Sequence, residues 1–233
     1  MTLPAAYGRE GRRGWHQHPM AIIWPCPLSA SSYAAAGRAI TVLPQACPGC
    51  NGQLTWWGGY WRWVRGRGPA EHRVWIRRGW CARCRRTQAL LPAFLFVRRL
   101  DENAVIGSAL TLAVAGAGAG AGARRVARHL ALPHTTVRDW WRRACARAPT
   151  LLAVLLTLAT SVDPAPVDSK ADGLSGVLEA LASAWQRARQ RLGARLSDRW
   201  GFWSLISGGL VLGTNTSPLF PGRSGASKVE ASP

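Results

Sequence analysis

Four cysteines in two Cys-x-x-Cys pairs constrain this chain more than any other feature of its sequence: Cys47, Cys50, Cys81 and Cys84. Four thiolates can converge on one tetrahedral ion, and Zn²⁺ prefers such ligands in a closed shell when its role is structural. Two pairs are a strong indication of a metal site, whereas one would be weak. The 30 residues between Cys50 and Cys81 exceed the usual spacing by about ten, so the intervening chain must form more than a minimal hairpin. We predict a zinc ribbon holding one structural Zn²⁺, with a pair of disulfides as the alternative.

The surroundings of these cysteines favour the reduced, metal-binding state. The sequence shows no secretory signal, and its Arg-rich composition suits a reduced cytosol, so we expect a cytoplasmic protein. The two remaining cysteines, Cys26 and Cys145, have no spacing that pairs them with others, and we expect free thiols.

Positive charge is concentrated in the ribbon and the stretch that follows it. Residues 47–147 hold 18 Arg and 4 acidic residues, a local balance of +14, whereas the rest of the chain holds 12 basic and 7 acidic residues. Such a field attracts polyanions, and nucleic acid is the commonest of them. We expect double-stranded DNA as the partner and no membrane, because the apolar run at 151–159 falls short of the roughly 20 residues that a membrane span needs.

Residues 46–100 are predicted to form the ribbon. Aromatic and β-branched residues around Gly58-Gly59 predict a β-hairpin, residues 73–77 alternate as a third strand, and residues 90–96 close the unit. Six Trp lie between positions 56 and 80, interleaved with Arg. We expect these Trp to form a core around the metal site, with an exposed base-stacking platform as the alternative.

Residues 101–148 carry the pattern of a helix-turn-helix. Asp101 or a neighbour is expected to cap a first helix that ends near residue 115, before a flexible Gly-Ala loop at 115–123. That loop is no phosphate-binding loop, because no Gly-Lys-Ser/Thr follows it. A short helix at 124–130 and a tight turn precede a helix capped by Thr135 or Thr136 and extending to about residue 147. This order is typical of DNA-reading units, and a basic hairpin that only packs on the ribbon is the alternative.

In a helix-turn-helix the second helix lies in the major groove and its first turns face the bases. Arginines there can read guanine or bind phosphate, and the sequence does not choose between these roles. The candidate DNA-binding residues are Thr135, Thr136, Arg138, Asp139, Arg142, Arg143, Arg124 and Arg125 in this unit and Arg62, Arg65, Arg77 and Arg78 in the ribbon.

The remaining segments complete an α+β organisation. We expect a disordered segment at 1–45, an apolar segment and linker at 149–172, and a disordered tail at 214–233. Residues 173–213 are predicted to hold an amphipathic helix followed by an apolar segment. We expect this helix to pack on its own domain, with a homodimer as the next alternative and binding to a membrane surface as the third.

Several short runs resemble an uncharacterised bacterial family, domain of unknown function 6431. They are Cys47–Cys50, Trp57–Tyr60, Arg77–Cys81, Thr87–Pro92 and Thr136–Arg143, in this order, with a weaker echo at 203–217. The resemblance covers about 46–147 and implies a zinc ribbon plus helix-turn-helix like the front end of transposases, with members expected near mobile elements. The Gly-Ala stretch at 115–123 departs from the family pattern.

Catalysis by this chain is not expected. A transposase needs three carboxylates on a ribonuclease-H-like sheet to hold two metal ions. After the helix-turn-helix the acidic residues are Asp163, Asp168, Asp172, Glu179, Asp198 and Glu230, and no run of alternating strands carries them. The sequence therefore predicts a zinc-containing DNA-binding protein, either a transposon-associated accessory protein or a transcriptional regulator. The alternative is an adaptor whose ribbon and C-terminal helix bind a transposase or polymerase subunit.

Overall fold

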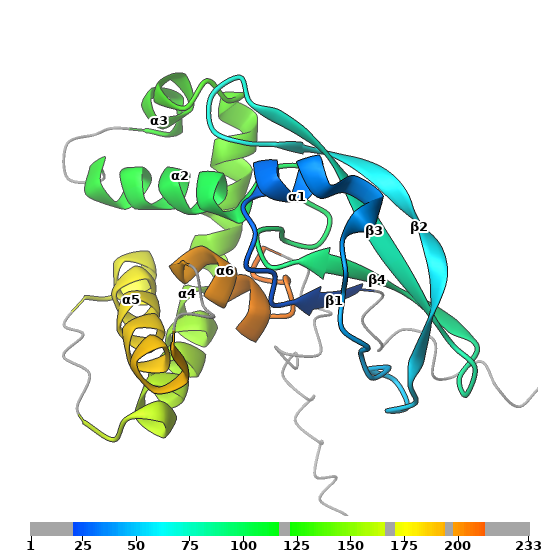
Figure 1. Ribbon diagram of the computed structural model, residues 1–233. Coiled ribbons are helices and arrows are strands. Elements are labelled where there is room, and N and C mark those ends of the chain that lie inside the picture. Colours follow the sequence, from blue (N-terminus) through cyan, green and yellow to red (C-terminus); the bar gives the residue numbers. More distant parts are fainter. Residues whose placement is uncertain (1–20, 117–121, 166–170, 194–197, 213–233) are drawn as a thin grey trace, which may run out of the picture.

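A four-stranded sheet forms one side of the molecule and six helices lie beside and across it, in the part of the chain that the structure describes (Figure 1). This computed structural model describes residues 21–116, 122–165, 171–193 and 198–212. The cysteine pairs lie at the sheet, and most of the helices follow it in sequence. The predicted α+β class is confirmed. The expected tail at 214–233 lies outside the described residues.

The sheet has the order β1-β4-β3-β2, which places β2 at one edge. Strands β2 (Leu54–Arg65) and β3 (Glu71–Cys81) pair antiparallel, as do β3 and β4 (Arg86–Pro92), whereas β1 (Ala21–Trp24) pairs parallel with β4. The antiparallel pairing places Leu54 opposite Cys81, so both cysteine pairs lie at the same end of the sheet.

The predicted hairpin exists, but Gly58-Gly59 is not its turn. Strand β2 continues through this pair with a shift of register between Trp56 and Gly59, and the chain turns instead at residues 66–70. Gly58 takes a positive φ of 89°, as in a β-bulge, and a Cβ at Gly59 would lie 2.7 Å from the Trp75 ring. The glycines thus admit a bulge and a close indole contact inside one long strand.

The expectation of disorder over 1–45 is wrong for its second half, whereas residues 1–20 lie outside the described part of the chain. Strand β1 belongs to the sheet beside β4, and helix α1 (Ala30–Ala36) packs against β3, followed by the short 3₁₀ turn η2 (Gly37–Ala39). Tyr33 is fully buried and donates a hydrogen bond to the Trp75 carbonyl oxygen. A four-residue strand and a seven-residue helix are too short to show a periodic pattern, and tertiary contacts order them.

Three helices form the predicted helix-turn-helix region: α2 (Asn103–Gly116), α3 (Ala123–His129) and the beginning of α4 (His134–Val162). Asp101 does not cap α2, because its carboxylate accepts a hydrogen bond from Arg65 at 2.9 Å. Pro133 is the N-cap of α4, so the helix begins before Thr135 and Thr136, which lie in its first turn. Proline suits this boundary because its φ is fixed near the helical value. Of the expected Gly-Ala loop, residues 117–121 lie outside the described part.

Helix α4 is one continuous helix of 29 residues, so the predicted helix end near 147 and the separate apolar segment from 149 are wrong. It passes through Pro149, where the Cys145 carbonyl loses its intrahelical partner, because burial of Ala148, Leu151 and Leu155 holds the helix together. By length and composition α4 is long and apolar enough to cross a membrane, and 22% of its most apolar window is buried.

Helix α5 (Gly173–Leu192) packs along the second half of α4 and runs in the same direction (Figure 1). Its apolar stripe includes the fully buried Val177 and Leu181, in agreement with the predicted amphipathic helix. Arg187 donates hydrogen bonds to the carbonyls of Asp163 and Ala165 just after α4 ends. This helix therefore packs on its own chain.

Helix α6 (Arg199–Ile206) and the turn after it join the sheet side to the helical side. Trp203 is buried and its ring meets Phe96 edge-on, with centroids 6.2 Å apart. Ser204 donates a hydrogen bond to the Leu95 carbonyl, and Arg147 from α4 donates one to the Leu210 carbonyl. The predicted apolar segment at the end of this region is therefore part of the core.

Candidate metal centre and nucleic-acid interface

Each cysteine pair lies on a tight backbone turn at the same end of the sheet. In the first turn, the backbone N–H of Asn51 donates to the Cys47 carbonyl, and in the second, that of Arg85 donates to the Cys81 carbonyl. Asn51 and Arg85, each directly after a second cysteine, both adopt a left-handed φ, of 57° and 56°. The two turns are thus built alike, and together they direct four sulfurs to one place.

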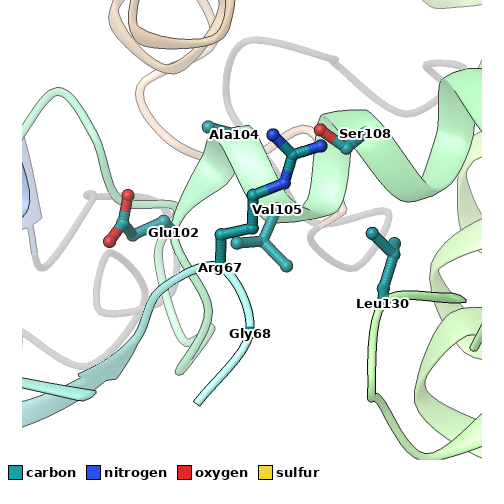
Figure 2. Close-up of a pocket in the computed structure, with 7 residues that line it drawn as sticks. All are labelled: Arg67, Gly68, Glu102, Ala104, Val105, Ser108 and Leu130. Atoms are coloured by element: carbon teal, nitrogen blue, oxygen red, sulfur yellow. The ribbon is translucent and has the colours of Figure 1, made fainter. Parts of the chain in front are cut away.

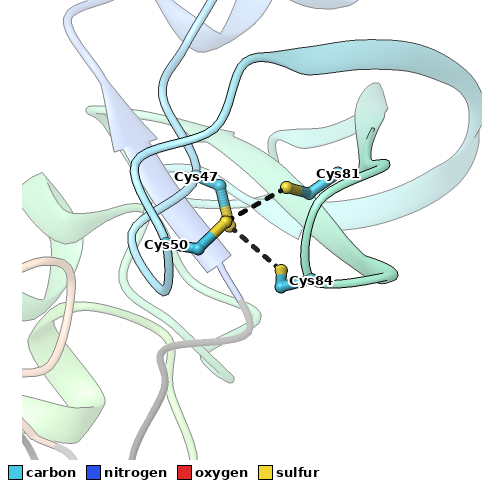
Figure 3. Close-up of side chains that lie close together, drawn as sticks. All are labelled: Cys47, Cys50, Cys81 and Cys84. Carbon is cyan, nitrogen blue, oxygen red and sulfur yellow. Dashed lines mark hydrogen bonds between the residues drawn. The ribbon is translucent and has the colours of Figure 1, made fainter.

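The four sulfur atoms lie within 4.8 Å of one another (Figure 3). The Sγ atoms of Cys47 and Cys84 are 3.5 Å apart, and those of Cys50 and Cys81 are 3.4 Å apart. These separations are well beyond a disulfide bond, and all six cysteines of the chain are free, including Cys26 and Cys145 as predicted. The disulfide alternative is therefore wrong in this structure, and the cluster could hold a metal ion.

Little apolar material surrounds the cysteine cluster. Its buried members are Cys47, Cys81 and Leu54, with Ile22 packed against them. A Cβ at Gly52 would lie 3.3 Å from the Cys81 sulfur and 3.4 Å from the Cys50 sulfur, so a larger residue there would crowd the sulfurs. Among the described residues these cysteines form the one group of three or more potential metal ligands close enough to share an ion.

The thiols differ in acidity. A hydrogen bond from the Cys84 backbone N–H lowers the pKa of the Cys81 thiol to about 7, although burial opposes this. Burial, reinforced by hydrogen bonds with the neighbouring thiols, raises the pKa of Cys84 to about 12. Four thiolates this close repel one another, so a bound cation is what would allow all four to ionise together.

Three of the four predicted phosphate-binding arginines of the ribbon are engaged within the protein. Arg62 donates to the Arg99 carbonyl, Arg65 pairs with Asp101, and Arg77 donates to the Ile40 carbonyl. These contacts tie the sheet to neighbouring segments. Arg78 is exposed, and in the described part of the chain no hydrogen bond or ion pair holds it. Of the four, Arg78 is thus the one most open to an outside anion.

Most of the residues predicted around the helix-turn-helix are exposed on α3 and α4. Arg124 and Arg125 are exposed on α3, and Thr135, Arg138 and Arg142 are exposed on α4, with 74% of the Arg142 side chain accessible. Thr136 and Arg143 are half-buried. The turn at 130–133 joins the two helices, and Ala131 in it has a left-handed φ of 53°.

Asp139 lies among three arginines instead of facing solvent alone. It accepts hydrogen bonds from Arg143 at 2.8 Å and Arg142 at 3.1 Å, and Arg99 lies 3.7 Å away. Burial opposes its ionisation, but the hydrogen bonds from Arg143 and Arg142 prevail and lower the pKa of Asp139 below its ordinary value. The carboxylate therefore orients two cations of α4 and links this helix to the segment after the sheet.

The sequence did not point to two further cations, one on α3 and one beside the turn between α3 and α4. Arg67, at the tip of the β2–β3 hairpin, reaches across the start of α2 towards Ser108, beside Leu130 of the interhelical turn (Figure 2). Arg128 is exposed on α3. The i, i+4 spacing from Arg124 could have found Arg128. No local signal could have found Arg67, because only the tertiary fold brings the hairpin tip to the helices.

The expectation of a tryptophan core around the metal is wrong for strand β2. Trp57 is 64% exposed, Trp63 59% and Trp56 41%. Trp75 and Trp61 pack together edge-on, with centroids 5.2 Å apart, on the face of the sheet next to η2, and Arg38 and Arg73 stack over them. The core of the sheet is instead aliphatic, with Val64, Val74 and Ile76 fully buried.

Comparison with known proteins finds a match to a family model. Residues 47–126 match the model of a family described as a domain of unknown function, DUF6431. No curated protein and no solved structure matches the chain. The matched segment begins at the first metal-ligand candidate, Cys47, and ends within helix α3.

Proposed function

We propose a zinc-containing DNA-binding role for this chain, whose residues 47–126 match the DUF6431 family model. The protein serves as an accessory component of a mobile element or as a transcriptional regulator. The observation that carries the proposal is the exposed face of α4 formed by Thr135, Arg138 and Arg142, directly after a four-residue turn. We call these three residues the α4 face.

Zinc is the ion that suits the cysteine cluster. Four thiolates at the usual Zn–S distance of about 2.3 Å would place neighbouring sulfurs about 3.8 Å apart. The observed sulfurs lie between 3.4 Å for the pair Cys50 and Cys81 and an upper limit of 4.8 Å, so small adjustments suffice. Cys47, Cys50, Cys81 and Cys84 would hold the ion and leave no open position on it, which assigns it a structural role. No catalytic activity is proposed for the chain.

Duplex DNA fits the arrangement of α3 and α4. In the helix-turn-helix geometry the second helix enters the major groove with its N-terminal residues near the bases, and the first helix crosses the backbone. The α4 face would then approach the base edges, while Arg124 and Arg125 approach phosphates. Arg67 would add a phosphate contact from the hairpin tip, since it lies beside the interhelical turn. The β2–β3 hairpin would thus add to the DNA contact made by α3 and α4.

An adaptor is the second candidate function, and one observation favours it. The second half of α4 exposes apolar side chains, with Val154 41% exposed and Leu152, Leu156 and Leu158 half-buried. Exposed apolar faces of this kind bind other proteins. In this alternative a polymerase or transposase subunit would cover the second half of α4, and the α4 face would not matter.

The test is fluorescence anisotropy of duplex DNA with the full zinc-loaded chain at two salt concentrations. We expect affinity to fall steeply with salt, and the double variant Arg138→Glu/Arg142→Glu to lose about tenfold or more. The matched control is Arg189→Glu/Arg191→Glu, which makes the same charge change on exposed positions of α5. An equal loss of DNA affinity in both double variants, or an affinity that does not depend on salt, would contradict a specific role for the α4 face. If the protein is an adaptor, both double variants would still bind its protein partner.

A further inference from the structure

The exposed aromatic side chains of strand β2 have no role in the proposed duplex contact. Besides the three exposed tryptophans, Tyr60 of this strand is 41% exposed. Aromatic rings bury large apolar areas in a folded core, so several exposed rings on one strand of a soluble domain point to a binding surface. The α4 face lies on another element, so these rings call for a separate ligand.

Of these rings, Tyr60 and Trp57 belong to the face of the sheet that is hollowed into a groove of about 540 Å³, whereas Trp56 and Trp63 lie on the other face, opposite Gly79 and Arg73. The sheet groove, as we name it, crosses all four strands, and residues 97–100 form its wall. Its lining residues are Ala21, Tyr60, Arg62, Arg78, Thr87, Ala89, Leu91, Val97, Arg98 and Leu100. The strand register confirms a shared face, because Arg78 lies opposite Ala89, which in turn lies opposite Ala21.

The charge of the sheet groove has one sign. Arg62, Arg78 and Arg98 line it, and no acidic residue does. Arg62 is held by the Arg99 carbonyl, whereas Arg78 and Arg98 are exposed and unpaired within the described part of the chain. Two unpaired guanidinium groups beside a fixed one form a site for an anionic ligand, and for more than one phosphate along the groove.

Aromatic rings lie on the floor of the groove and beyond its end. Tyr60 lines the groove directly. Trp80 lies opposite the lining residue Thr87 in the register of β3 and β4, and the Trp57 ring packs 6.0 Å from it. The surface therefore continues from the cations towards the cysteine turns, where the exposed Trp57 ring packs on the half-buried Trp80.

We propose that the sheet groove binds a single-stranded polynucleotide, with bases stacked on Tyr60 and the Trp57–Trp80 pair and phosphates on Arg78 and Arg98. Cationic grooves with exposed aromatic rings are how sheet-based domains bind single strands, because every base has a face that can stack. Paired bases of a duplex are already stacked and cannot use these rings. The proposal goes beyond the duplex contact of the α4 face and does not depend on it.

The test measures binding of labelled oligo-dT and oligo-U of twelve nucleotides to the full zinc-loaded chain. The two oligonucleotides distinguish DNA from RNA as the source of the strand. We expect Tyr60→Ala and Arg78→Glu each to weaken binding about tenfold or more. The matched control is Trp63→Ala, which removes a ring that is 59% exposed on the same strand but on the opposite face, because Trp63 pairs with Arg73.

The outcomes of this test decide the proposal. Loss in Tyr60→Ala and Arg78→Glu but not in Trp63→Ala supports it, provided that bound zinc and the melting temperature stay as in the wild type. Similar loss in all three variants, or no binding of either oligonucleotide by the wild type, overturns it. The Arg138→Glu/Arg142→Glu chain separates the two sites, because it should still bind single strands when duplex binding is lost. A groove that instead captures a protein partner would show no oligonucleotide binding.

Discussion

The cysteine end of the sheet and the helical half of the molecule are held together by different means. At the cysteine end the buried cluster consists of Cys47, Cys81 and Leu54. The helical half has a continuous core that extends from Phe96 to Leu212 and includes residues from all of α2 to α6. The first region buries very little apolar surface, and the second buries a great deal.

This difference shows which region needs an ion. Burial stabilises by roughly 25 cal/mol for each Å² of apolar surface, so a cluster of one leucine and a few thiols contributes little. A metal bond network can replace such a core, as in small zinc domains that unfold without their ion. We expect the helical half, which has a continuous apolar core, to keep its fold without the ion. We therefore expect the two regions to respond differently to the same treatments.

The largest expected effect comes from removing the metal ligands. Cys81→Ser, or chelation of the wild type, should unfold the cysteine end of β2, β3 and β4, because structural zinc contributes about 10–16 kcal/mol in small domains. Hydrogen exchange measured along the chain should show lost protection there and retained protection in α4 and α5. Cys145→Ser is the matched control and should bind metal as the wild type does, since this thiol lies in α4. If α4 and α5 lose protection together with the sheet, the two regions form one cooperative unit.

A smaller effect is expected at the helical core. Trp203→Ala removes a ring that is 1% exposed and packs on Phe96 and Trp200. Its loss should lower the free energy of unfolding by about 3–5 kcal/mol, measured by denaturant unfolding with zinc present. Trp63→Ala, which removes a ring that is 59% exposed, should change it by less than about 0.5 kcal/mol. Similar values for the two variants would mean that the helical core is not closely packed around Trp203.

The contact between Arg65 and Asp101 tests the junction of the two regions. Asp101 has 3% of its side chain exposed, and Arg65 has 36%. We expect Asp101→Asn to destabilise the protein by about 1–3 kcal/mol, because it weakens a charge-assisted hydrogen bond to a buried carboxylate. A double-mutant cycle with Arg65→Gln, followed by thermal unfolding, should reveal a coupling between the two sites. Strictly additive losses would show that the pair does not act as a unit.

The smallest effect is expected at Asp139, and it depends on pH. Because the pKa of this carboxyl is lowered in the folded state, its ionised form stabilises the protein above the unfolded pKa of about 3.9, and this contribution is lost as pH falls through the folded pKa. Asp139→Asn should therefore cost less than about 1 kcal/mol near pH 7 and nothing at strongly acid pH. This prediction is tested by melting temperatures of the wild type and of Asp139→Asn, measured from strongly acid pH to pH 7. A difference that grows as pH falls would have the wrong sign.

Local chemistry in the sequence determined much of the site. The spacing of Cys47, Cys50, Cys81 and Cys84 predicted a shared cluster, since each pair needs only its own turn to present two sulfurs. The short basic helix, the turn and the start of α4 were also predictable, because Pro133, the apolar spacing and the exposed arginines are all local signals. The α+β class followed from the same patterns.

Only the tertiary structure decided how these parts meet. It made Gly58-Gly59 a bulge, because β3 continues to pair beyond it and Trp75 packs against Gly59. It paired the short strand β1 with β4, and it carried α4 past Pro149, where burial outweighs a missing hydrogen bond. In the folded protein, Arg62, Arg65 and Arg77 bind groups of the protein itself, and Tyr60 lies beside the unpaired Arg78 and Arg98 in the sheet groove. Contacts between residues far apart in sequence govern all of these outcomes, and no local pattern records them.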